Sequence, residues 1–314
     1  MSVPNLQAPD AVVMVRPHRF HPNPETAQDN AFQRNSGRLP TAQALALSNA
    51  AREEVSAAAF RLQEAGVEVH VFDDHGDRET PDSVFPNNWF STHAGGHVAL
   101  YPMCAPNRRR ERRVDILEML KEKYCVQEVI DYSGLERDNL FLEGTGAMVL
   151  DHLHRVAYTA LSNRASEVVL KRFCTHFNFE PMPFRTADHA GRAIYHTNVM
   201  MCIANQFALV ALDLISDTAQ REEVKRRLEE SGHTVLTLDQ LQVEAFSGNA
   251  IELAGKQGPI LAMSRRGVAQ LDPAQRRTIE RHATLLPLSV PTIEMAGGSV
   301  RCMIAGIHLA RRSP

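Results

Sequence analysis

The sequence predicts an α/β fold built from five repeats of a strand–strand–helix–strand unit, arranged in a ring. Two observations predict it: a nearly constant step between similar segments, and the same element order after each. Five apolar stretches open on a polar or reactive residue, at steps of 55, 53, 53 and 53 residues. They open at Asn88, Glu143, His196, Asn249 and Cys302. A period of about 50 residues is typical of arrays and propellers. Equivalent positions of a closed ring converge on one axis, so these side chains are expected to meet.

Each of the first four openings begins a predicted β-hairpin, because two apolar runs flank a turn signal. The hairpin sequences are NWFSTHAGGHVALYP, GAMVLDHLHRVAYTAL, TNVMMCIANQFALVAL and NAIELAGKQGPILAMS. Their nearly continuous apolar character indicates strands with little exposure to solvent. The remaining unit is permuted. The chain starts with a predicted strand at residues 11–16, and the terminal segment 302–310 can pair with it to close the ring.

A helix is predicted after each hairpin, and an Ala-rich helix ended by Gly66 is predicted near the start of the chain. The ranges are 41–65, 110–123, 164–177, 218–231 and 273–286. Residues at helical spacing define the faces expected to be buried: Val114, Leu117 and Leu120; Val168, Val169 and Phe173; Val224 and Leu228. Ser162 or Asn163 is expected to cap the third helix, and Asp272-Pro273 to start the last.

A final strand is predicted after each helix, at residues 67–72, 126–130, 179–183, 234–238 and 286–290. No Pro/Ser-rich linker or low-complexity segment interrupts the series. The sequence therefore predicts one catalytic domain over residues 1–314.

The composition excludes several classes of function. Hydrophobic residues make up 44% and charged residues 23%, which is ordinary for a globular protein. The net charge of -3 gives no reason to expect a nucleic-acid or acidic-membrane partner. No apolar run reaches the roughly 18 residues of a membrane span, and no signal-peptide pattern is present. The five cysteines contain no CxxC pair, which favours reduced thiols in the cytoplasm.

Three of the openings carry side chains that can act together. Cys302 follows two glycines and precedes a strand-like run, so its thiol can face a cavity. His196 opens an apolar strand, and Glu143 lies between an apolar run and a Gly-Thr-Gly segment, where a carboxylate is costly to bury unpaired. A thiolate nucleophile, an imidazole proton carrier and a substrate-holding carboxylate suit substitution at a planar carbon that bears nitrogens. Neither a metal nor an organic cofactor is required.

The remaining histidine and cysteine patterns predict no further functional site. His152 and His154 form an HxH pair, but no third ligand of suitable spacing accompanies them, so no metal site is expected there. Four cysteines inside predicted strands and helices are expected to be structural: Cys104, Cys125, Cys174 and Cys202. From the residues alone, a buried structural role for Cys302 and a solvated turn at Glu143 remain open.

Four motifs, in this order and repeat phase, resemble the guanidine-modifying (amidinotransferase, or pentein) superfamily: FPNNWF, LEGTG, HTN and GGSVRCM. The superfamily includes arginine deiminases, dimethylarginine hydrolases and glycine amidinotransferases, and the whole-chain pattern looks most like its citrullinase branch. The resemblance implies a five-bladed α/β propeller of ββαβ units. It also implies that Cys302 is the nucleophile, His196 the general acid/base, and Glu143 the carboxylate that contacts the substrate nitrogens.

The same resemblance implies two clamps for a substrate carboxylate. Arg164, in LSNRAS, matches an arginine that grips the α-carboxylate. A second clamp is expected within the run 108–110, and Arg110 is the preferred member. An arginine suits this task because its planar fork donates two parallel hydrogen bonds.

Two departures from the family pattern bear on the substrate. Arginine deiminases have aspartates at the positions of Asn88 and Asn198, where they clamp a guanidinium cation. Neutral amides both donate and accept hydrogen bonds, so they suit an uncharged ureido group better. A guanidinium that lost both counter-charges would be costly to bury. Asp82 is close enough in sequence to supply a carboxylate instead, and contact with it would weaken the case for a neutral substrate.

The sequence therefore predicts a hydrolase that cleaves the ureido group of citrulline to ornithine, ammonia and carbon dioxide through a covalent intermediate on Cys302. Two alternatives stay open: an arginine or methylarginine deiminase or amidinotransferase with the same site, and a catalytically silent binding protein. The polar segment 18–33 is either a substrate-covering loop, with Asn23, Asn30 or Phe32 near the ligand, or an ordinary surface loop. The sequence does not fix the oligomeric state, and a homodimer remains open.

Overall fold

The computed structural model describes residues 7–34 and 39–312, and its strands form five separate three-stranded sheets. In each sheet the middle strand pairs antiparallel with one neighbour and parallel with the other. Four sheets consist of β3 (Phe90–His93), β4 (His97–Leu100) and β5 (Glu128–Asp131); β6 (Met148–Asp151), β7 (Val156–Ala160) and β8 (Glu180–Phe184); β9 (Met201–Ile203), β10 (Phe207–Val210) and β11 (Thr234–Thr237); and β12 (Ile251–Gly255), β13 (Gly258–Ser264) and β14 (Thr284–Leu288). The predicted strand order within each unit is thus confirmed.

The fifth sheet joins the two ends of the chain. It has the order β15-β1-β2, with β1 at Ala11–Pro17, β2 at Glu68–Asp74 and β15 at Ala305–Gly306. The antiparallel register places Val12 opposite Gly306 and Val13 opposite Ala305. The expected pairing of the terminal segment with the first strand is confirmed, although only two residues of that segment form a strand.

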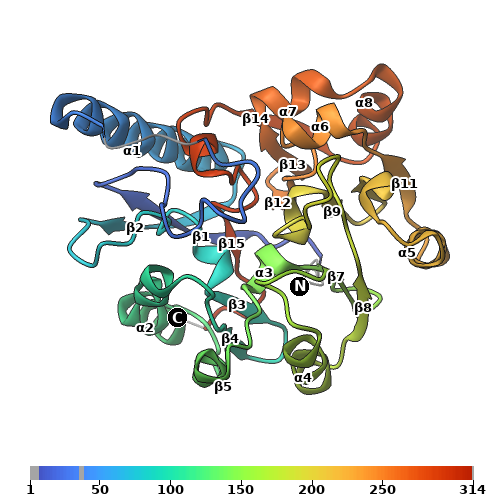
Figure 1. The fold of residues 1–314 in the computed structure, drawn as a ribbon, viewed down its shortest axis with the longest axis horizontal. Helices are drawn as coiled ribbons and strands as arrows, with labels where there is room; N and C mark the ends of the chain where they lie inside the picture. Colours follow the sequence, from blue (N-terminus) through green and yellow to red (C-terminus); the bar gives the residue numbers. More distant parts are fainter. Residues whose placement is uncertain (1–6, 35–38, 313–314) are drawn as a thin grey trace.

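The helices lie at the periphery, with the strands between them and the centre (Figure 1). The main ones are α1 (Thr41–Glu64), α2 (Val114–Lys123), α4 (Glu167–Phe177), α5 (Thr218–Glu230) and α8 (Pro273–Glu280). The start of α8 is fixed by a capping box between Asp272 and Gln275. The sequence did not predict the short helices α6 (Gln240–Glu244) and α7 (Arg265–Gln270).

Two predicted helices begin later than expected. Residues 106–111 form a 3₁₀ turn, so α2 starts at Val114, which is 64% exposed, and Ile116 is buried in its place. The helix α4 starts at Glu167, so neither Ser162 nor Asn163 caps it, and Val168 is exposed. In both cases the helix is rotated relative to the predicted face, while Leu120 and Phe173 are buried as expected.

Short turns precede the first strand of several sheets, and the residues that open the sequence repeats lie in or next to these turns. Residues 86–88 and 197–199 form 3₁₀ turns before β3 and β9, and α3 (Gly144–Ala147) precedes β6. Gly144 has φ +48°, and a Cβ there would collide with the backbone of Asn87. A Cβ on Gly146 would collide with the Asn88 side chain and lie 2.8 Å from Nδ1 of His196. The two glycines therefore let three turns from different repeats approach one another.

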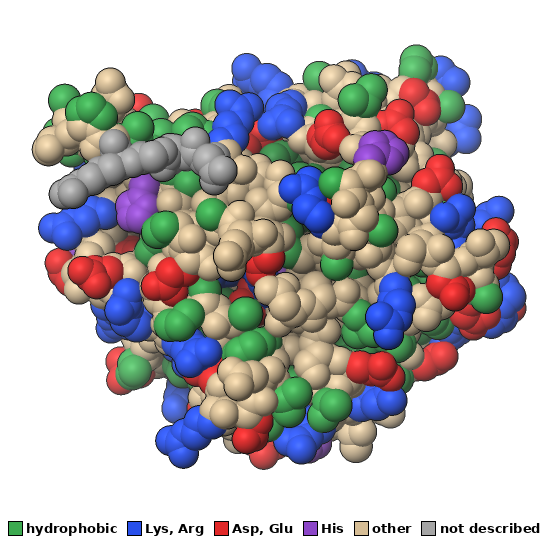
Figure 2. Space-filling model, viewed as in Figure 1, with side chains coloured by type: hydrophobic (Ala, Val, Ile, Leu, Met, Phe, Trp, Pro, Cys, Tyr) green, Lys and Arg blue, Asp and Glu red, His purple; other side chains and the backbone are tan. Residues whose placement is uncertain are grey.

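The charged side chains on one face of the molecule indicate no particular binding partner. On the face shown in Figure 2, acidic and basic side chains alternate without a continuous basic area. Within the described residues, no helix combines the length and the apolar character needed to cross a membrane.

Candidate active site

The turns that open the repeats bring distant side chains into one narrow pocket. Cys302, His196, Asn88, Asp82 and Arg164 all line it, although they are far apart in the sequence. The rest of its wall consists of Asn30, Phe85, Arg108, Tyr195, Ala296 and Gly298. Glu143 is completely buried and contacts His196 and the pocket arginines.

The Cys302 thiol is held by two amides. Sγ accepts hydrogen bonds from Nδ2 of Asn249, at 3.2 Å, and from Nδ2 of Asn198, at 3.3 Å. Asn249 also donates to the carbonyl of Asn198, and its Oδ1 accepts from the backbone N–H groups of Arg301 and Cys302. Two amide N–H donors are therefore aimed at the sulfur.

Three of the other four cysteines are poor nucleophiles. Burial, together with the negative charge of Glu143, raises the pKa of the Cys104 thiol to about 11. Burial raises the pKa values of Cys174 and Cys202 to about 12. These three thiols are protonated near neutral pH, so they lack the reactive thiolate form.

His196 and Glu143 form a buried pair. Nε2 of His196 lies 2.8 Å from Oε2 of Glu143. A carboxylate only accepts hydrogen bonds, so Nε2 carries the proton and Nδ1 keeps a free lone pair. Burial lowers the pKa of His196 to about 4, although the hydrogen bond to Glu143 opposes the shift. The imidazole is therefore neutral near pH 7 and can accept a proton.

Arginines surround Glu143. Burial disfavours its charged form, but Arg164, the hydrogen bond from His196 and Arg108 outweigh burial and hold its pKa far below the usual range. The guanidinium NH1 atoms of Arg108 and Arg164 lie 3.4 Å and 3.7 Å from Oε2 of Glu143. Oε1 accepts from the backbone N–H of Cys104 at 3.0 Å. Glu143 is thus a fixed, ionised group.

Arg108 links a second carboxylate to the same network. Its Nε lies 3.6 Å from Oδ2 of Asp82, and Nε and NH2 donate to the two oxygens of buried Glu111 at 2.9 Å and 3.0 Å. Oδ2 of Asp82 also accepts from Nδ2 of Asn23 at 2.8 Å. Its other oxygen is buried and has no hydrogen-bond partner among the described residues. That oxygen is available to a ligand N–H.

The loop between β1 and α1 covers the pocket. Asp29 forms a two-pronged ion pair with Arg164, in which Arg164 Nε donates to Oδ2 at 3.0 Å and NH2 donates to Oδ1. Asn30 lines the pocket and donates to the carbonyl of Ala296 at 3.2 Å. Of the interpretations left open for this segment, the geometry favours a covering loop. Phe32 packs beside Tyr195 and Phe246, outside the pocket.

Two placements differ from the sequence expectation. Arg110 lies outside the pocket, with a half-exposed side chain paired with Glu79, and Arg108 is the member of the run that lines it. The 3₁₀ turn at residues 106–111 directs Arg108 inward. Asn198 does not line the pocket and instead contacts the thiol of Cys302. No catalytic task was predicted for Asn249, although its position in the repeat marked it. Nothing in the sequence pointed to Tyr195 or to the pairing of Asp29.

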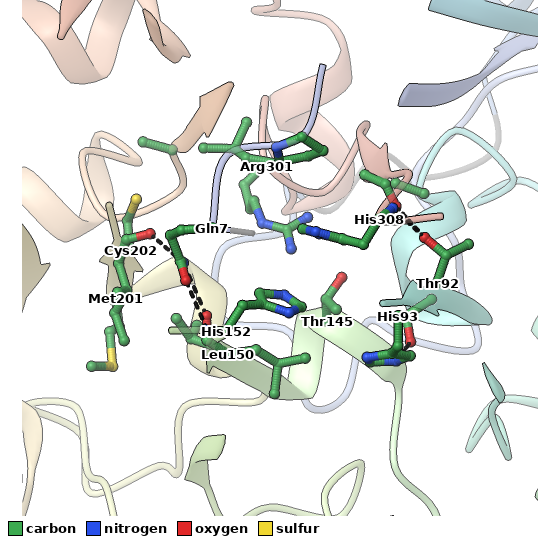
Figure 3. A pocket seen from close by; sticks show the side chains of 18 of the residues that line it. Gln7, Thr92, His93, Thr145, Leu150, His152, Met201, Cys202, Arg301 and His308 are labelled. Carbon is green, nitrogen blue, oxygen red and sulfur yellow. Dashed lines mark hydrogen bonds between the residues drawn. The ribbon is translucent and has the colours of Figure 1, made fainter. Parts of the chain in front are cut away.

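A second cavity, of about 50 Å³, is lined by the inner strands and lacks such a constellation. Figure 3 shows Arg301, His152 and His308 pointing into it. Burial holds the pKa of His152 well below its usual range, as it does for His93 in the wall. Its cysteine, Cys202, has a raised pKa, so the pocket at Cys302 is the candidate active site.

Comparison with protein families agrees with this geometry. A family model described as N,N dimethylarginine dimethylhydrolase, eukaryotic, matches residues 16–309. The chain belongs to this family. It is accordingly a member of the pentein superfamily of guanidino-modifying enzymes, and the resemblance seen in the sequence is confirmed. No curated protein matches the chain.

Solved structures share the fold at low sequence identity. The N-terminal domain of ArgZ, a cyanobacterial arginine dihydrolase, was solved as a cysteine-to-serine variant bound to substrate; it is 15% identical, with a TM-score of 0.73, and the match covers 95% of this chain and 99% of that one. DDAH from Pseudomonas aeruginosa, complexed with citrulline, is 16% identical, with a TM-score of 0.58 and coverages of 97% and 100%.

Some matches are to much longer proteins. AgrE in complex with ornithine and NAD+ is 15% identical, with a TM-score of 0.72, and the match covers 96% of this chain but 40% of that one. The chain also spans 40% of the full ArgZ chain. The fold is therefore an α/β arrangement of five small sheets like that of its pentein neighbours.

Proposed function

We propose that this chain is a cysteine-dependent hydrolase that cleaves the ureido C–N bond of citrulline, or a close relative, to ornithine, ammonia and carbon dioxide. One observation carries the choice of a ureido group. At the position where arginine deiminases carry an aspartate, Asn88 presents a neutral amide to the pocket. A neutral amide donates and accepts hydrogen bonds as a ureido group requires, but it supplies no counter-charge for a guanidinium.

The polar groups around the reacting position suit a ureido group. The free oxygen of Asp82 can accept one of its N–H groups. Asn88, which lines the pocket, can donate to the ureido oxygen or accept from its nitrogens. Arg164 can hold the α-carboxylate once Asp29 releases it, since its fork already binds a carboxylate there.

The proposed reaction uses Cys302, with its two amide donors, and the hydrogen-bonded pair of His196 and Glu143. The sulfur of Cys302, which accepts hydrogen bonds from Asn249 and Asn198, attacks the ureido carbon and forms a C–S bond. Neutral His196 takes the thiol proton and gives it to the departing amine as the C–N bond breaks. His196 then removes a proton from water, whose oxygen forms a C–O bond to the same carbon as the C–S bond breaks, and the proton returns to the Cys302 sulfur. The remaining carbamate decomposes to the amine and carbon dioxide.

Hydrolysis of a guanidino substrate is the second candidate. The family match is to dimethylarginine dimethylhydrolase, and the unpartnered oxygen of Asp82 could also accept from a guanidinium. ArgZ is described as an arginine dihydrolase, and the Pseudomonas enzyme was solved with citrulline. These descriptions belong to the neighbours, and they are compatible with either substrate here.

Product analysis separates the candidates. Purified protein is incubated with citrulline, arginine or dimethylarginine, and ornithine, citrulline and ammonia are quantified. We expect ornithine and ammonia from citrulline, with a higher kcat/KM than for either guanidino compound. Turnover of arginine or dimethylarginine without turnover of citrulline would overturn the proposal and support the second candidate. Cys302→Ser serves as the control that abolishes any genuine turnover.

We also infer that the five sheets close into a propeller that forms one catalytic domain. The pairing of β15 with β1 supports this, because it joins the two ends of the chain in one sheet. We further propose a cytoplasmic location, since all five cysteines are free.

A further inference from the structure

A second cluster of chemistry-bearing side chains lies at the end of β6 and is not used by the proposed reaction. Asp151, the last residue of β6, His154, in the β6–β7 turn, and His233, just before β11, each offer one ligand atom, and these atoms lie within 4.8 Å of one another. The HxH pair lacked a third ligand in the sequence because His233 lies far along the chain from Asp151 and His154. His152, its first member, points into the second cavity (Figure 3).

His233 is the feature that calls for a ligand. Its side chain is 1% exposed, and neither ring nitrogen has a partner with full hydrogen-bond geometry among the described residues, although the ring interacts with the backbone of Leu228 and Ala204. Buried polar atoms are almost always satisfied, so such an imidazole indicates a missing water or ion. Nδ1 of His233 lies 3.9 Å from Oδ2 of Asp151.

Hydrogen bonds fix the Asp151 carboxylate in a position where it and His154 can bind the same ligand. Asp151 is completely buried, and its Oδ1 accepts from the backbone N–H groups of Leu153 and His154. Oδ2 therefore points toward the imidazoles, with Nδ1 of His154 at 2.9 Å. Two ligands of a tetrahedral ion with bonds near 2.0 Å lie about 3.3 Å apart. The two separations that involve Oδ2 of Asp151, 2.9 Å and 3.9 Å, bracket this value, and all three donor atoms lie within 4.8 Å of one another.

We propose that Asp151, His154 and His233 form a site for a divalent transition-metal ion such as Zn²⁺. Two imidazole nitrogens and one carboxylate oxygen suit Zn²⁺ or Co²⁺, whereas Mg²⁺ and Ca²⁺ prefer oxygen ligands. The half-exposed side chain of His154 leaves an approach from solvent, and water completes the coordination.

The site's place in the fold indicates a stabilising task. Asp151 and His154 belong to the hairpin of the sheet β6-β7-β8, whereas His233 adjoins β11 of the sheet β11-β10-β9. A bound ion would connect two neighbouring sheets. β6 starts beside the active-site turn and ends at Asp151, so the ion would lie at the opposite end of the strand from Glu143. It would stabilise the folded chain without taking part in catalysis.

Metal titration of the full chain tests the proposal. After chelator treatment, Zn²⁺ binding is measured by competition with a chromophoric chelator, and Co²⁺ binding by visible absorption. We expect one ion per chain, a Co²⁺ spectrum without a thiolate charge-transfer band, and a rise in Tm on metal addition. His154→Gln should weaken binding by about 100-fold or more, since even second-shell changes cost 10–100-fold. Because His154 is partly exposed, this variant should remain folded and keep its metal-free activity.

Two controls make the outcome decisive. Cys302→Ser should bind the metal as the wild type does, and so should His189→Gln, which removes an exposed histidine elsewhere. The proposal is overturned if no stoichiometric binding occurs, if His154→Gln binds as tightly as the wild type, or if Cys302→Ser loses the metal. The last result would assign the ion to the active-site thiol.

Discussion

At the scale of single residues, the site depends on one buried hydrogen bond. Glu143 accepts from Nε2 of His196 at 2.8 Å, which fixes the tautomer and leaves Nδ1 as the proton acceptor. Burial keeps the imidazole neutral, with a pKa of about 4, so the carboxylate does not hold an imidazolium in the resting state. In the proposed reaction, in which His196 takes the thiol proton, the fixed charge of Glu143 stabilises the cation that forms.

Glu143→Gln removes that charge at constant size. We expect kcat to fall about 100- to 10,000-fold, the usual range for a disabled acid/base. Glu111→Gln is a matched control, because Glu111 also pairs with buried Arg108 but does not contact His196. Glu143→Gln breaks a buried ion pair and should lose about 3–5 kcal/mol of stability in urea unfolding. Burial raises the pKa of Glu111 to about 8, so Glu111→Gln should lose less stability near pH 7. Equal losses of kcat in the two variants would contradict a specific role for Glu143.

The charge of the substrate is tested at Asn88. Asn88→Asp adds a negative charge to the pocket wall, and the amide of Asn87 can turn to donate to it. A charged hydrogen bond exceeds a neutral one by roughly 1.4 kcal/mol, so the ratio of kcat/KM for arginine over citrulline should rise on the order of 10-fold. Asn87→Asp puts the same charge outside the pocket and should leave the ratio unchanged. An unaltered ratio in Asn88→Asp would remove the amide argument.

At the scale of elements, the loop between β1 and α1 governs access to Arg164. Asp29 occupies the guanidinium fork, and Asn163 also donates to Asp29. A surface cavity of about 340 Å³, lined by Asp29, Asn30 and Asn163, lies on the outer side of this loop. Asn30 lines both this cavity and the active-site pocket. If Arg164 holds the substrate α-carboxylate as proposed, that carboxylate replaces the Asp29 carboxylate on Arg164.

Asp29→Asn removes the competing charge. We expect KM for the substrate to fall on the order of 10-fold, the equivalent of one charge-assisted contact, with kcat unchanged. Glu25→Gln is the control, because Glu25 belongs to the same loop but accepts from the backbone of Asn107. Steady-state kinetics of both variants measure KM and kcat, and Glu25→Gln should leave both unchanged. A higher KM in Asp29→Asn would mean that Asp29 binds the substrate, for example its ammonium group.

The sequence predicted elements better than side-chain directions. Alternating apolar runs, turn signals and the cap at Asp272 are local features, so the strand order and the start of α8 were predictable. Which arginine of the run 108–110 turns inward depends on a 3₁₀ turn with no sequence signal of its own. The pairing of Asp29 with Arg164 spans 135 residues, and only the assembled fold brings the two together.

At the scale of the whole molecule, the sequence repeat explains why residues that are far apart in the chain meet at the candidate active site. The five openings start inner strands or lie beside them, so a period of 53 residues becomes nearness in space. Asn249, Asn198 and Cys302 contact one another, and Glu143 contacts His196. The repeat period thus predicted which residues meet, even where the chemistry of one position, Asn249, was not predicted.

The stability of the whole chain should depend on pH through its buried neutral histidines. Burial lowers the pKa of His196 to about 4 and that of His93 well below its usual range. The unfolded chain then binds more protons below pH 6.5, so stability is lost as pH falls from there toward the folded-state values. His196 alone should cost about 2 kcal/mol between pH 7 and pH 5. Urea unfolding across this range measures the slope, which His93→Gln should reduce and exposed His189→Gln should not. A stability that does not vary with pH over this window would show that neither buried imidazole is kept neutral by the fold.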